Sequence, residues 1–440
     1  MKRMKVSFIS CLLMTFFAAN LFAQEDSLKE QRFNIHGQAT VITQFKSGFS
    51  AKYAGPNSLT DTAENATSIT ATLFMSAKLW KNASLSFDPE IAGGKGISQV
   101  LGIAQATNGE TFRIGSPEPK VYISRLYFNQ IIPLTKKTVW QDDDVNQLQT
   151  QIPEKYLSFT VGKISLEDYF DDNSYAHDPR TEFMNWNLMA AGAWDYPANT
   201  RGYAPSIVLQ YISPENELRY AFSLIPKQAN GSSMNWNIAK SHSETIEYAH
   251  HYHLHQNNGT IRFLAFLTNG KMGDYAQAVN EMPVYPDITN TRQYGRTKYG
   301  FVINAEQEFG KNFGAFARGS WNDGKTETWV FTEIDRALTL GGQLNGNMWR
   351  RNNDKFGFAY GITGISKQHR DYLAAGGNGF MLGDGKLNYA PENLIECYYN
   401  AQVTKNIYFS ADDQIILNPG YNKDRKGPIN VFSIRVHYDL

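Results

Sequence analysis

Residues 69–79 read ITATLFMSAKL, and in this stretch apolar and polar side chains alternate along the chain. Ile69 and Leu73, for example, alternate with Thr70 and Thr72. A period of two residues puts alternate side chains on opposite faces of an extended chain, so it predicts a β-strand with one apolar face. The same alternation recurs at residues 33–46, 83–90, 395–404 and 432–440. The sequence therefore predicts an all-β protein.

The alternating stretches predict an even number of strands, sixteen. They are placed at residues 33–46, 68–80, 83–91, 119–131, 155–164, 203–212, 217–226, 245–255, 260–269, 298–308, 313–321, 329–344, 355–365, 393–403, 406–417 and 429–440. The connections after even-numbered strands are mostly short, as at residues 81–82, and those after odd-numbered strands are mostly long, as at 165–202. The exceptions are a long connection at 132–154 and a short one at 322–328.

Short turns at one end and long loops at the other are typical of outer-membrane barrels. The predicted fold is a closed antiparallel transmembrane β-barrel of sixteen strands, or alternatively eighteen, with long extracellular loops and short periplasmic turns. Closure would also remove the exposed strand edges that a long sheet leaves. A soluble sandwich or a β-propeller would alternate too, but neither explains the asymmetry of the loops.

The first residues of the chain predict export. A basic start at residues 2–5 precedes a short apolar run at 6–19, as in a secretory signal peptide. The chain is thus expected to comprise a signal peptide at 1–23, a short periplasmic segment at 24–32 and an outer-membrane barrel at 33–440 with a loop that folds inward near 165–202. The expected location is the cell outer membrane.

Composition argues against several other classes. Lys and Arg together number 42, as do Asp and Glu, so there is no basic footprint for nucleic acid. The mean hydropathy is −0.43, and after the first residues no apolar run approaches the roughly 18 residues of a membrane-spanning helix. Cys397 is the one cysteine beyond the signal peptide, so no internal disulfide is expected.

Residues 248–256 read YAHHYHLHQ and are rich in histidine. On a strand, His251, His253 and His255 share a face with Glu247. Two of these imidazoles could bind zinc. A polar wall inside a barrel explains the same pattern more simply, and we expect no metal.

Two pairs of neighbouring carboxylates, Asp171 with Asp172 and Asp412 with Asp413, could in principle serve glycoside hydrolysis. Such pairs are common on solvated loops, and nothing in the sequence fixes a proton-donating partner. We therefore expect no catalytic residues, no cofactor and no enzymatic activity.

Residues 164–186 read ISLEDYFDDNSYAHDPRTEFMNW, without a helical or strand period. A sugar presents hydroxyl groups, which charged and amide side chains can hydrogen-bond, and apolar C–H faces, which aromatic rings can cover. The alternative is a loop that packs on itself, with these residues paired internally. The candidate pore and substrate-binding residues of this loop are Asp168, Tyr169, Asp171, Asp172, Asn173, Asp178, Arg180, Glu182, Trp186, Trp194 and Asp195.

A second set of charged residues lies at polar positions of the predicted strands. These positions face the lumen of a barrel, because the apolar positions face lipid. The candidate lumen-wall residues are Glu90, Arg125, Glu247, His251, His253, Glu396 and Arg435.

Several blocks of the chain resemble the OprB family of carbohydrate-selective porins. The most specific are VGKISLEDYFDDNSYAHDPRTEFMNW at 161–186 and HRDYLAAGGNGFMLGDGKLNYAPENLIECYY at 369–399. The resemblance implies a sixteen-stranded outer-membrane barrel whose pore is narrowed by inward-folded loops lined with charged and aromatic residues. Carried over by position, Asp171, Asn173, Asp178 and Arg180 match the pattern of the family.

The expected function is passive, carbohydrate-selective diffusion of mono- or small oligosaccharides through an outer-membrane porin. Selectivity in such a pore comes from its diameter, hydrogen-bonding groups and local charge. The expected partners are small carbohydrate solutes, outer-membrane lipid and the barrel-assembly machinery, and a monomer is favoured. A general or ion-selective porin remains the main alternative, and a secreted β-rich glycoside hydrolase is a third.

Overall fold

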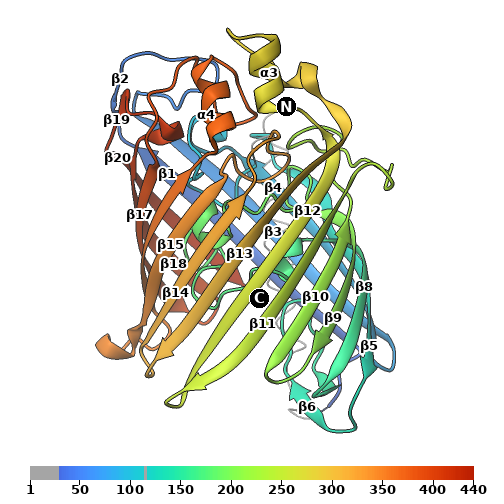
Figure 1. Cartoon of the computed structure of the whole chain (residues 1–440). Coiled ribbons are helices and arrows are strands. Elements are labelled where there is room, and N and C mark those ends of the chain that lie inside the picture. The colour runs from blue at the N-terminus through green and yellow to red at the C-terminus, as the bar shows by residue number, and fades with distance from the viewer. Residues whose placement is uncertain (1–28, 113–115) are drawn as a thin grey trace, which may run out of the picture.

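The computed structural model describes residues 29–112 and 116–440, and its main feature is a closed antiparallel barrel (Figure 1). The predicted signal peptide lies outside the described residues. The sixteen strands of the barrel are β1 (Phe33–Lys46), β3 (Glu64–Trp80), β4 (Ala83–Gly94), β5 (Lys120–Pro133), β8 (Tyr156–Ile164), β9 (Ala204–Ile212), β10 (Asn216–Ser223), β11 (His242–Leu254), β12 (Asn257–Met272), β13 (Gln293–Phe309), β14 (Phe313–Asn322), β15 (Arg336–Asn345), β16 (Lys355–Gly364), β17 (Glu392–Thr404), β18 (Ile407–Leu417) and β20 (Ile429–Asp439).

Closure of the barrel depends on the first strand. Thr40 of β1 lies opposite Thr70 of β3 on one side and opposite His437 of β20 on the other. Each strand therefore has two neighbours, and the prediction of a closed sixteen-stranded barrel is confirmed.

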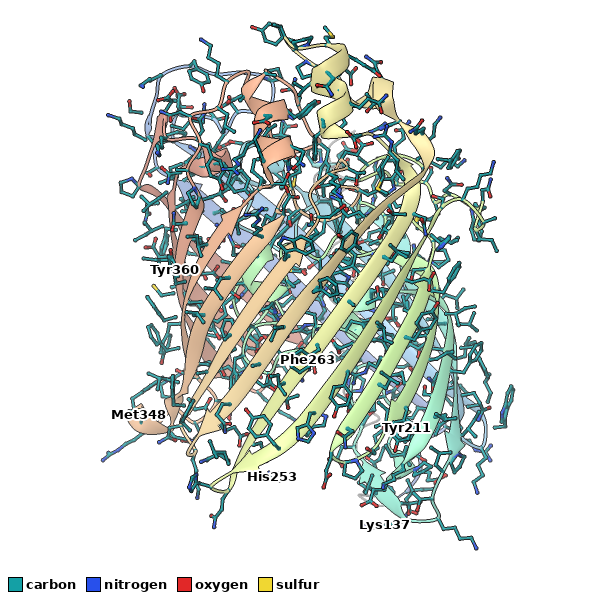
Figure 2. The ribbon with its side chains drawn as sticks, viewed as in Figure 1. Lys137, Tyr211, His253, Phe263, Met348 and Tyr360 are labelled. Carbon is teal, nitrogen blue, oxygen red and sulfur yellow. The ribbon has the colours of Figure 1, made fainter. Side chains whose placement is uncertain are left out.

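Alternation along the strands separates an apolar outer surface from a polar interior. In β1, Gln38 and Gln44 are buried, whereas Ile35 and Phe45 are 60% and 43% exposed. Figure 2 shows Tyr211, Phe263 and Tyr360 on the outer surface of the wall. In a membrane barrel the exposed apolar side chains face lipid.

The two ends of the barrel differ. The long loops at one end contain helices α3 (Tyr275–Glu281) and α4 (Lys367–Ala374) and the short strands β2 (Ser50–Ala51) and β19 (Arg425–Lys426), all at the top of Figure 1. The opposite end has short turns and one hairpin, formed by β6 (Thr138–Gln141) and β7 (Thr150–Pro153). By the usual orientation of such barrels, the long loops are extracellular and the turns periplasmic.

The remaining helical elements are single turns in the connections: the 3-10 turns η2 (Ile97–Val100), η3 (Leu166–Asp168), η4 (Ile288–Thr291), η5 (Gly346–Trp349) and η6 (Pro419–Tyr421), and the short helix α2 (Trp186–Met189). Among the helices of the described residues, none is long and apolar enough to cross a membrane.

One predicted strand, at 329–344, is placed wrongly at its beginning. The observed strand β15 begins at Arg336, and residues 329–335 belong to the preceding loop. The backbone N–H groups of Trp329 and Val330 both donate to the carboxylate of Asp195, at 2.7 Å, instead of to a neighbouring strand. An apolar, β-branched stretch therefore packs inside the barrel as a loop, and the connection predicted at 322–328 extends to residue 335.

The loop from residue 165 to 203 occupies much of the barrel interior. Phe170, Phe183 and Trp194 are fully buried. The loop contacts wall strands through hydrogen bonds, including one from the Asn400 side chain of β17 to the carbonyl of Thr181 at 3.1 Å. The water-filled part of the lumen is thus confined to the space that this loop leaves free.

Candidate functional site

A cavity of about 610 Å³ lies beside the loop of residues 165–203. It extends from Asn199 and Arg201 toward the long-loop end to His36 and Asp439 near the short-turn end. Its wall residues come from β20, β1, β3, β4 and β5. The volume falls within the range of small-molecule sites, roughly 300–1,000 Å³.

The first charged group of the cavity is Arg125 with Asp168. Arg125 projects from β5, and its Nε and Nη2 donate to the two carboxylate oxygens of Asp168 at 2.7 and 2.5 Å. The guanidinium also lies over the ring of Tyr203, 5.3 Å from its centroid. This bidentate geometry fixes both side chains at the edge of the opening.

The second charged group consists of Arg180 with Glu110 and Glu90. Nε of Arg180 lies 3.2 Å from Oε2 of Glu110, and its Nη2 lies 3.9 Å from Oε2 of Glu90. The hydroxyl of Thr70 donates to Glu110, and the hydroxyls of Tyr122 and Tyr203 donate to Glu90. Both carboxylates are thus held by hydroxyl donors from the wall and the loop.

Arg201 is the third guanidinium. It stacks on the ring of Tyr122, with its Cζ 3.9 Å from the ring centroid, and lies 5.4 Å from the centroid of Phe112. Arg201 lies at the end of the loop, three residues before β9 begins at Ala204. It adds a cation whose planar face is covered by aromatic surface.

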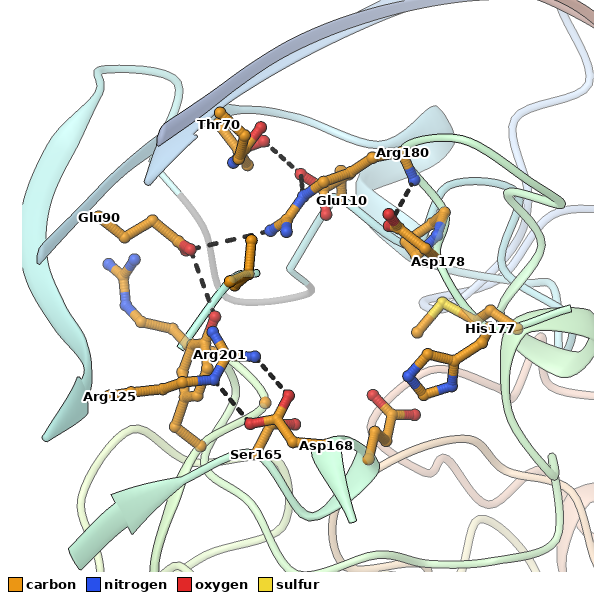
Figure 3. A pocket seen from close by; sticks show the side chains of 18 of the residues that line it. Thr70, Glu90, Glu110, Arg125, Ser165, Asp168, His177, Asp178, Arg180 and Arg201 are labelled. Atoms are coloured by element: carbon orange, nitrogen blue, oxygen red, sulfur yellow. Dashed lines mark hydrogen bonds and ion pairs between the residues drawn. The ribbon is translucent and has the colours of Figure 1, made fainter. Parts of the chain in front are cut away.

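Figure 3 shows Glu90, Glu110, Arg180, Asp178, His177, Asp168, Arg125 and Arg201 around a central opening. We call Arg125, Arg180, Arg201, Glu90, Glu110 and Asp168 the charged ring. It holds three guanidinium groups and three carboxylates, so a solute in the opening meets donors and acceptors on several sides.

His177 and Glu167 also line the cavity. Burial alone would lower the pKa of His177, but the charges of Asp172 and Glu167 act more strongly, and the pKa is raised above 6.5. Burial raises the pKa of Glu167 to about 7, against the opposing charge of His177. The charge of this side of the cavity therefore changes near neutral pH.

Four of the predicted loop residues line the cavity: Asp168, Asp178, Arg180 and Trp186. Trp186 is 7% exposed, and its ring stacks on Phe331 with 5.4 Å between centroids and 11° between planes. Its indole N–H donates to the carbonyl of Asn108 at 2.8 Å. Trp186 thus borders the opening while holding two loops together.

Other predicted loop residues attach the loop to the wall. Asp171 is 1% exposed and accepts from Nε of Arg318 in β14 at 2.9 Å. The Asn173 side chain donates to Asn304 of β13 at 2.8 Å. Asp195 binds residues 329–331, and Trp194 is completely buried.

Three predicted loop residues belong to neither of these two groups. Tyr169 borders a smaller cavity near the short-turn end. Glu182 accepts from the backbone N–H of His177 at 2.9 Å and lies 3.6 Å from Nζ of Lys355. Asp172 is exposed and lies 3.6 Å from Arg262.

Among the predicted lumen-wall residues, only Glu90 and Arg125 line the main cavity. Glu247 accepts from the N–H of Asp171 at 2.8 Å, and Glu396 accepts from the N–H of Met184 at 2.6 Å. Arg435 donates to the carbonyls of Pro179 and Glu182 at 2.6 and 2.8 Å. These three wall residues bind the loop.

The histidines of β11 lie away from the cavity. Nε2 of His251 is 3.3 Å from Glu217, and its Nδ1 is 3.0 Å from the hydroxyl of Thr260. His253 is exposed at the short-turn end (Figure 2). Within residues 29–112 and 116–440, no group of three or more potential ligand side chains is arranged for a metal ion.

The paired carboxylates are separated by the fold. Asp171 binds Arg318, whereas Asp172 points to solvent. Asp412 is buried on the lumen face of β18, and Asp413 accepts from the Asn430 side chain at 2.7 Å. Neither pair presents two free carboxylates to one cavity.

Sequence reasoning missed Glu110, Phe112, Arg201 and Tyr203. Arg201 and Tyr203 are at the end of the loop already singled out, and an arginine near an aromatic residue could have suggested them. Glu110 and Phe112 belong to another long loop, and no local pattern sets them apart.

A family model described as "Carbohydrate-selective porin, OprB family" matches residues 57–440. No curated protein matches the chain. Among solved structures, that of OprB from Pseudomonas putida at high pH is 14% identical, covers 93% of this chain and 94% of its own, and has a TM-score of 0.71. The low-pH structure of the same protein is 11% identical, covers 93% of each chain and has a TM-score of 0.50. At these identities the similarity concerns the fold.

Proposed function

Because the chain belongs to the OprB family of carbohydrate-selective porins, we propose that its charged ring is where small carbohydrates are selected. The protein is an outer-membrane porin, and carbohydrates are its solutes. Within the pore, we propose that the carbohydrate contacts the residues of the charged ring. The observation that supports it is the single cavity that carries the charged ring and reaches toward both ends of the barrel.

The chemistry of the ring suits a neutral polyhydroxylated solute. Guanidinium groups only donate hydrogen bonds and carboxylates only accept them, so a ring that contains both can satisfy both roles of a hydroxyl group. The rings of Phe112 and Tyr203, which also line the cavity, offer apolar surface to C–H groups.

The ion pairs of the ring can exchange partners with a solute. The side chains of Arg125, Arg180 and Asp168 are 13%, 18% and 31% exposed, so water reaches them. Asp168 is the most exposed member of these pairs, and contacts of a partly exposed carboxylate are weaker than those of a buried one. A hydroxyl group can therefore share the hydrogen bonds of Asp168, and binding stays weak enough for release.

We also propose that transport needs no cofactor and that the protein does not turn over glycans. Its candidate carboxylate pairs are bound by Arg318 or lie on opposite faces of β18. One barrel encloses a complete cavity, which is compatible with a functional monomer inserted into lipid by the barrel-assembly machinery.

Liposome swelling with a graded series from monosaccharides to trisaccharides tests the proposal. We expect entry of neutral monosaccharides, slower entry as the sugar grows, and slower entry of salts than of sugars of similar size. The sugars should be recovered intact. Failure to admit any sugar would contradict the transport proposal, and equal rates for sugars and salts would favour a general porin.

A further inference from the structure

The connection of residues 134–155 is unlike its neighbours at the short-turn end. Others at this end are brief, as at residues 81–82 and 405–406. Here the chain forms the separate hairpin of β6 and β7, with Val139 opposite Ile152. An added hairpin at a barrel end that otherwise has short turns requires a role.

The tip of this hairpin, residues 142–148, is bound to the lumen face of β1. The Asn34 side chain is 5% exposed, and its Nδ2 donates to the carboxylate of Asp143 at 3.1 Å and to the carbonyls of Asp144 and Gln147 at 2.9 and 2.8 Å. Nε2 of His36 is 3.1 Å from the same Asp143 carboxylate.

A second attachment joins the tip to β4. Nδ2 of Asn146 donates to Oδ2 of Asp88 at 2.8 Å. Asp88 is fully buried and lies 3.7 Å from Nη1 of Arg125, a member of the charged ring. Leu148 is 7% exposed, so the tip also buries an apolar side chain. The tip is thus fixed to two wall strands that are not adjacent in the barrel, β1 and β4.

Asp144 and Val145 of the tip line the same cavity as Arg180. They lie at its short-turn end, where Gln38 and Asp439 also line it. Asp142, Asp143 and Asp144 are consecutive and exposed. A solute that crosses the cavity from the charged ring toward the short-turn end therefore passes this acidic segment.

We propose that this hairpin is the periplasmic constriction of the pore and that Asp142 and Asp144 determine specificity by holding back anions. Carboxylates that line a pore disfavour anions. In the charged ring three guanidinium groups are balanced by three carboxylates, whereas the tip adds acidic residues alone, so the tip is placed to hold back anions while neutral sugars pass. This inference rests on the proposed function, because it assumes that solutes cross this cavity.

The charge variant Asp142→Asn with Asp144→Asn tests the inference in planar bilayers under a KCl gradient. We expect the chloride-to-potassium permeability ratio to rise by about threefold, the size expected for two unit charges roughly a Debye length from the ion in water. Gluconate entry into liposomes should rise in parallel, and glucose entry should stay as in the wild type. Glu215→Gln is the matched control, since Glu215 is an exposed carboxylate of another turn at the same end.

A cysteine at the tip tests the constriction independently of charge. In a Cys397→Ser background, a neutral, bulky thiol reagent on Val145→Cys should reduce conductance, whereas the same reagent on Val139→Cys should not. Val139 is 41% exposed on the same hairpin but does not line the cavity. Heat-dependent migration in SDS gels verifies that each variant is folded.

The outcomes separate the two proposals. An unchanged permeability ratio in the charge variant, together with unchanged conductance after labelling at position 145, would overturn the hairpin inference while sugar entry still supports the porin. If the wild type admits no sugar, the proposed function itself fails.

Discussion

The loop of residues 165–203 forms two acid–arginine pairs with the barrel wall, and the two pairs have different tasks. Asp171 and Arg318 are each 1% exposed, and Arg318 also donates to the carbonyls of Leu188 and Ala176 at 2.6 and 3.1 Å. Asp168 and Arg125 are 31% and 13% exposed and border the cavity. The first pair fastens the loop, and the second lines the cavity in which we propose that the solute passes. Burial and additional backbone contacts, rather than pairing itself, distinguish an anchor from a filter.

The strongest test of this difference removes the anchor. Asp171→Ala leaves the Arg318 guanidinium buried without its carboxylate, which typically costs about 3–5 kcal/mol. We expect a lower midpoint in denaturant unfolding of the detergent-solubilised barrel, together with a larger and less stable single-channel conductance as the loop loosens.

Asp172→Ala is the control, because the neighbouring Asp172 side chain is 55% exposed and its contact with Arg262 is 3.6 Å long. Arg262 keeps its closer partner Glu306, at 3.3 Å, in this variant, so loss of the exposed Asp172 carboxylate should cost at most about 1 kcal/mol. Equal unfolding midpoints for the two variants would contradict the role of Asp171 as an anchor.

The filter side is tested by Arg180→Ala. Removal of this guanidinium leaves Glu90 and Glu110 without their nearest cation, so potassium permeability should rise relative to chloride and sugar selectivity should fall several-fold. The unfolding midpoint should fall less than in Asp171→Ala, because Arg180 is 18% exposed to the cavity, whereas Arg318 is 1% exposed. Arg350→Ala, at an exposed turn, is the control. A variant that unfolds easily while keeping its selectivity would place Arg180 among the anchors.

A smaller, pH-dependent effect is expected at the extracellular loops. Nδ1 of buried His369 lies 3.1 Å from Asp335, and Ser366 donates its N–H to Asp335 at 2.8 Å. Burial alone would raise the pKa of Asp335, but the charge and hydrogen bond of His369 and the charge of Lys298 leave it below 3.8. A folded-state pKa below the unfolded value gives stability that is present above the unfolded pKa and is lost as the pH falls through the folded one.

We therefore expect pepsin to cleave the loop of residues 365–391 faster as the pH falls below about 4, where this contribution fades. Asp335→Asn should lose that part of the pH dependence and be cleaved readily throughout. Cleavage of the wild type that stays constant over this range, after correction for the activity of the protease, would exclude Asp335 as the responsible group.

The sequence predicts the wall better than the lumen, for a physical reason. Alternation such as that of residues 69–79 depends on local geometry, because every second side chain must face lipid. Asp171 pairs with Arg318, and Glu110 pairs with Arg180. Each pair joins residues far apart in the chain, which a local sequence pattern cannot indicate. Residues 329–335 show where local alternation fails to predict a strand. Their sequence is typical of a strand, but the backbone N–H groups of Trp329 and Val330 donate to Asp195 instead of to a neighbouring strand.

The loop of residues 165–203 is bound mainly to β11, β13, β14 and β17, with a further attachment to Arg435 of β20, and the cavity lies against β20, β1, β3, β4 and β5. Substitutions on the two sides of the barrel are therefore expected to have different effects. Substitutions at the inward positions of β11, β13, β14 and β17 would loosen the packed side, whereas substitutions of Thr70, Glu90 or Arg125 on β3, β4 and β5 would change the lining of the cavity. A change of sugar preference would therefore need substitutions at only a few positions on three neighbouring strands. The contacts that hold the loop against the rest of the wall would stay the same.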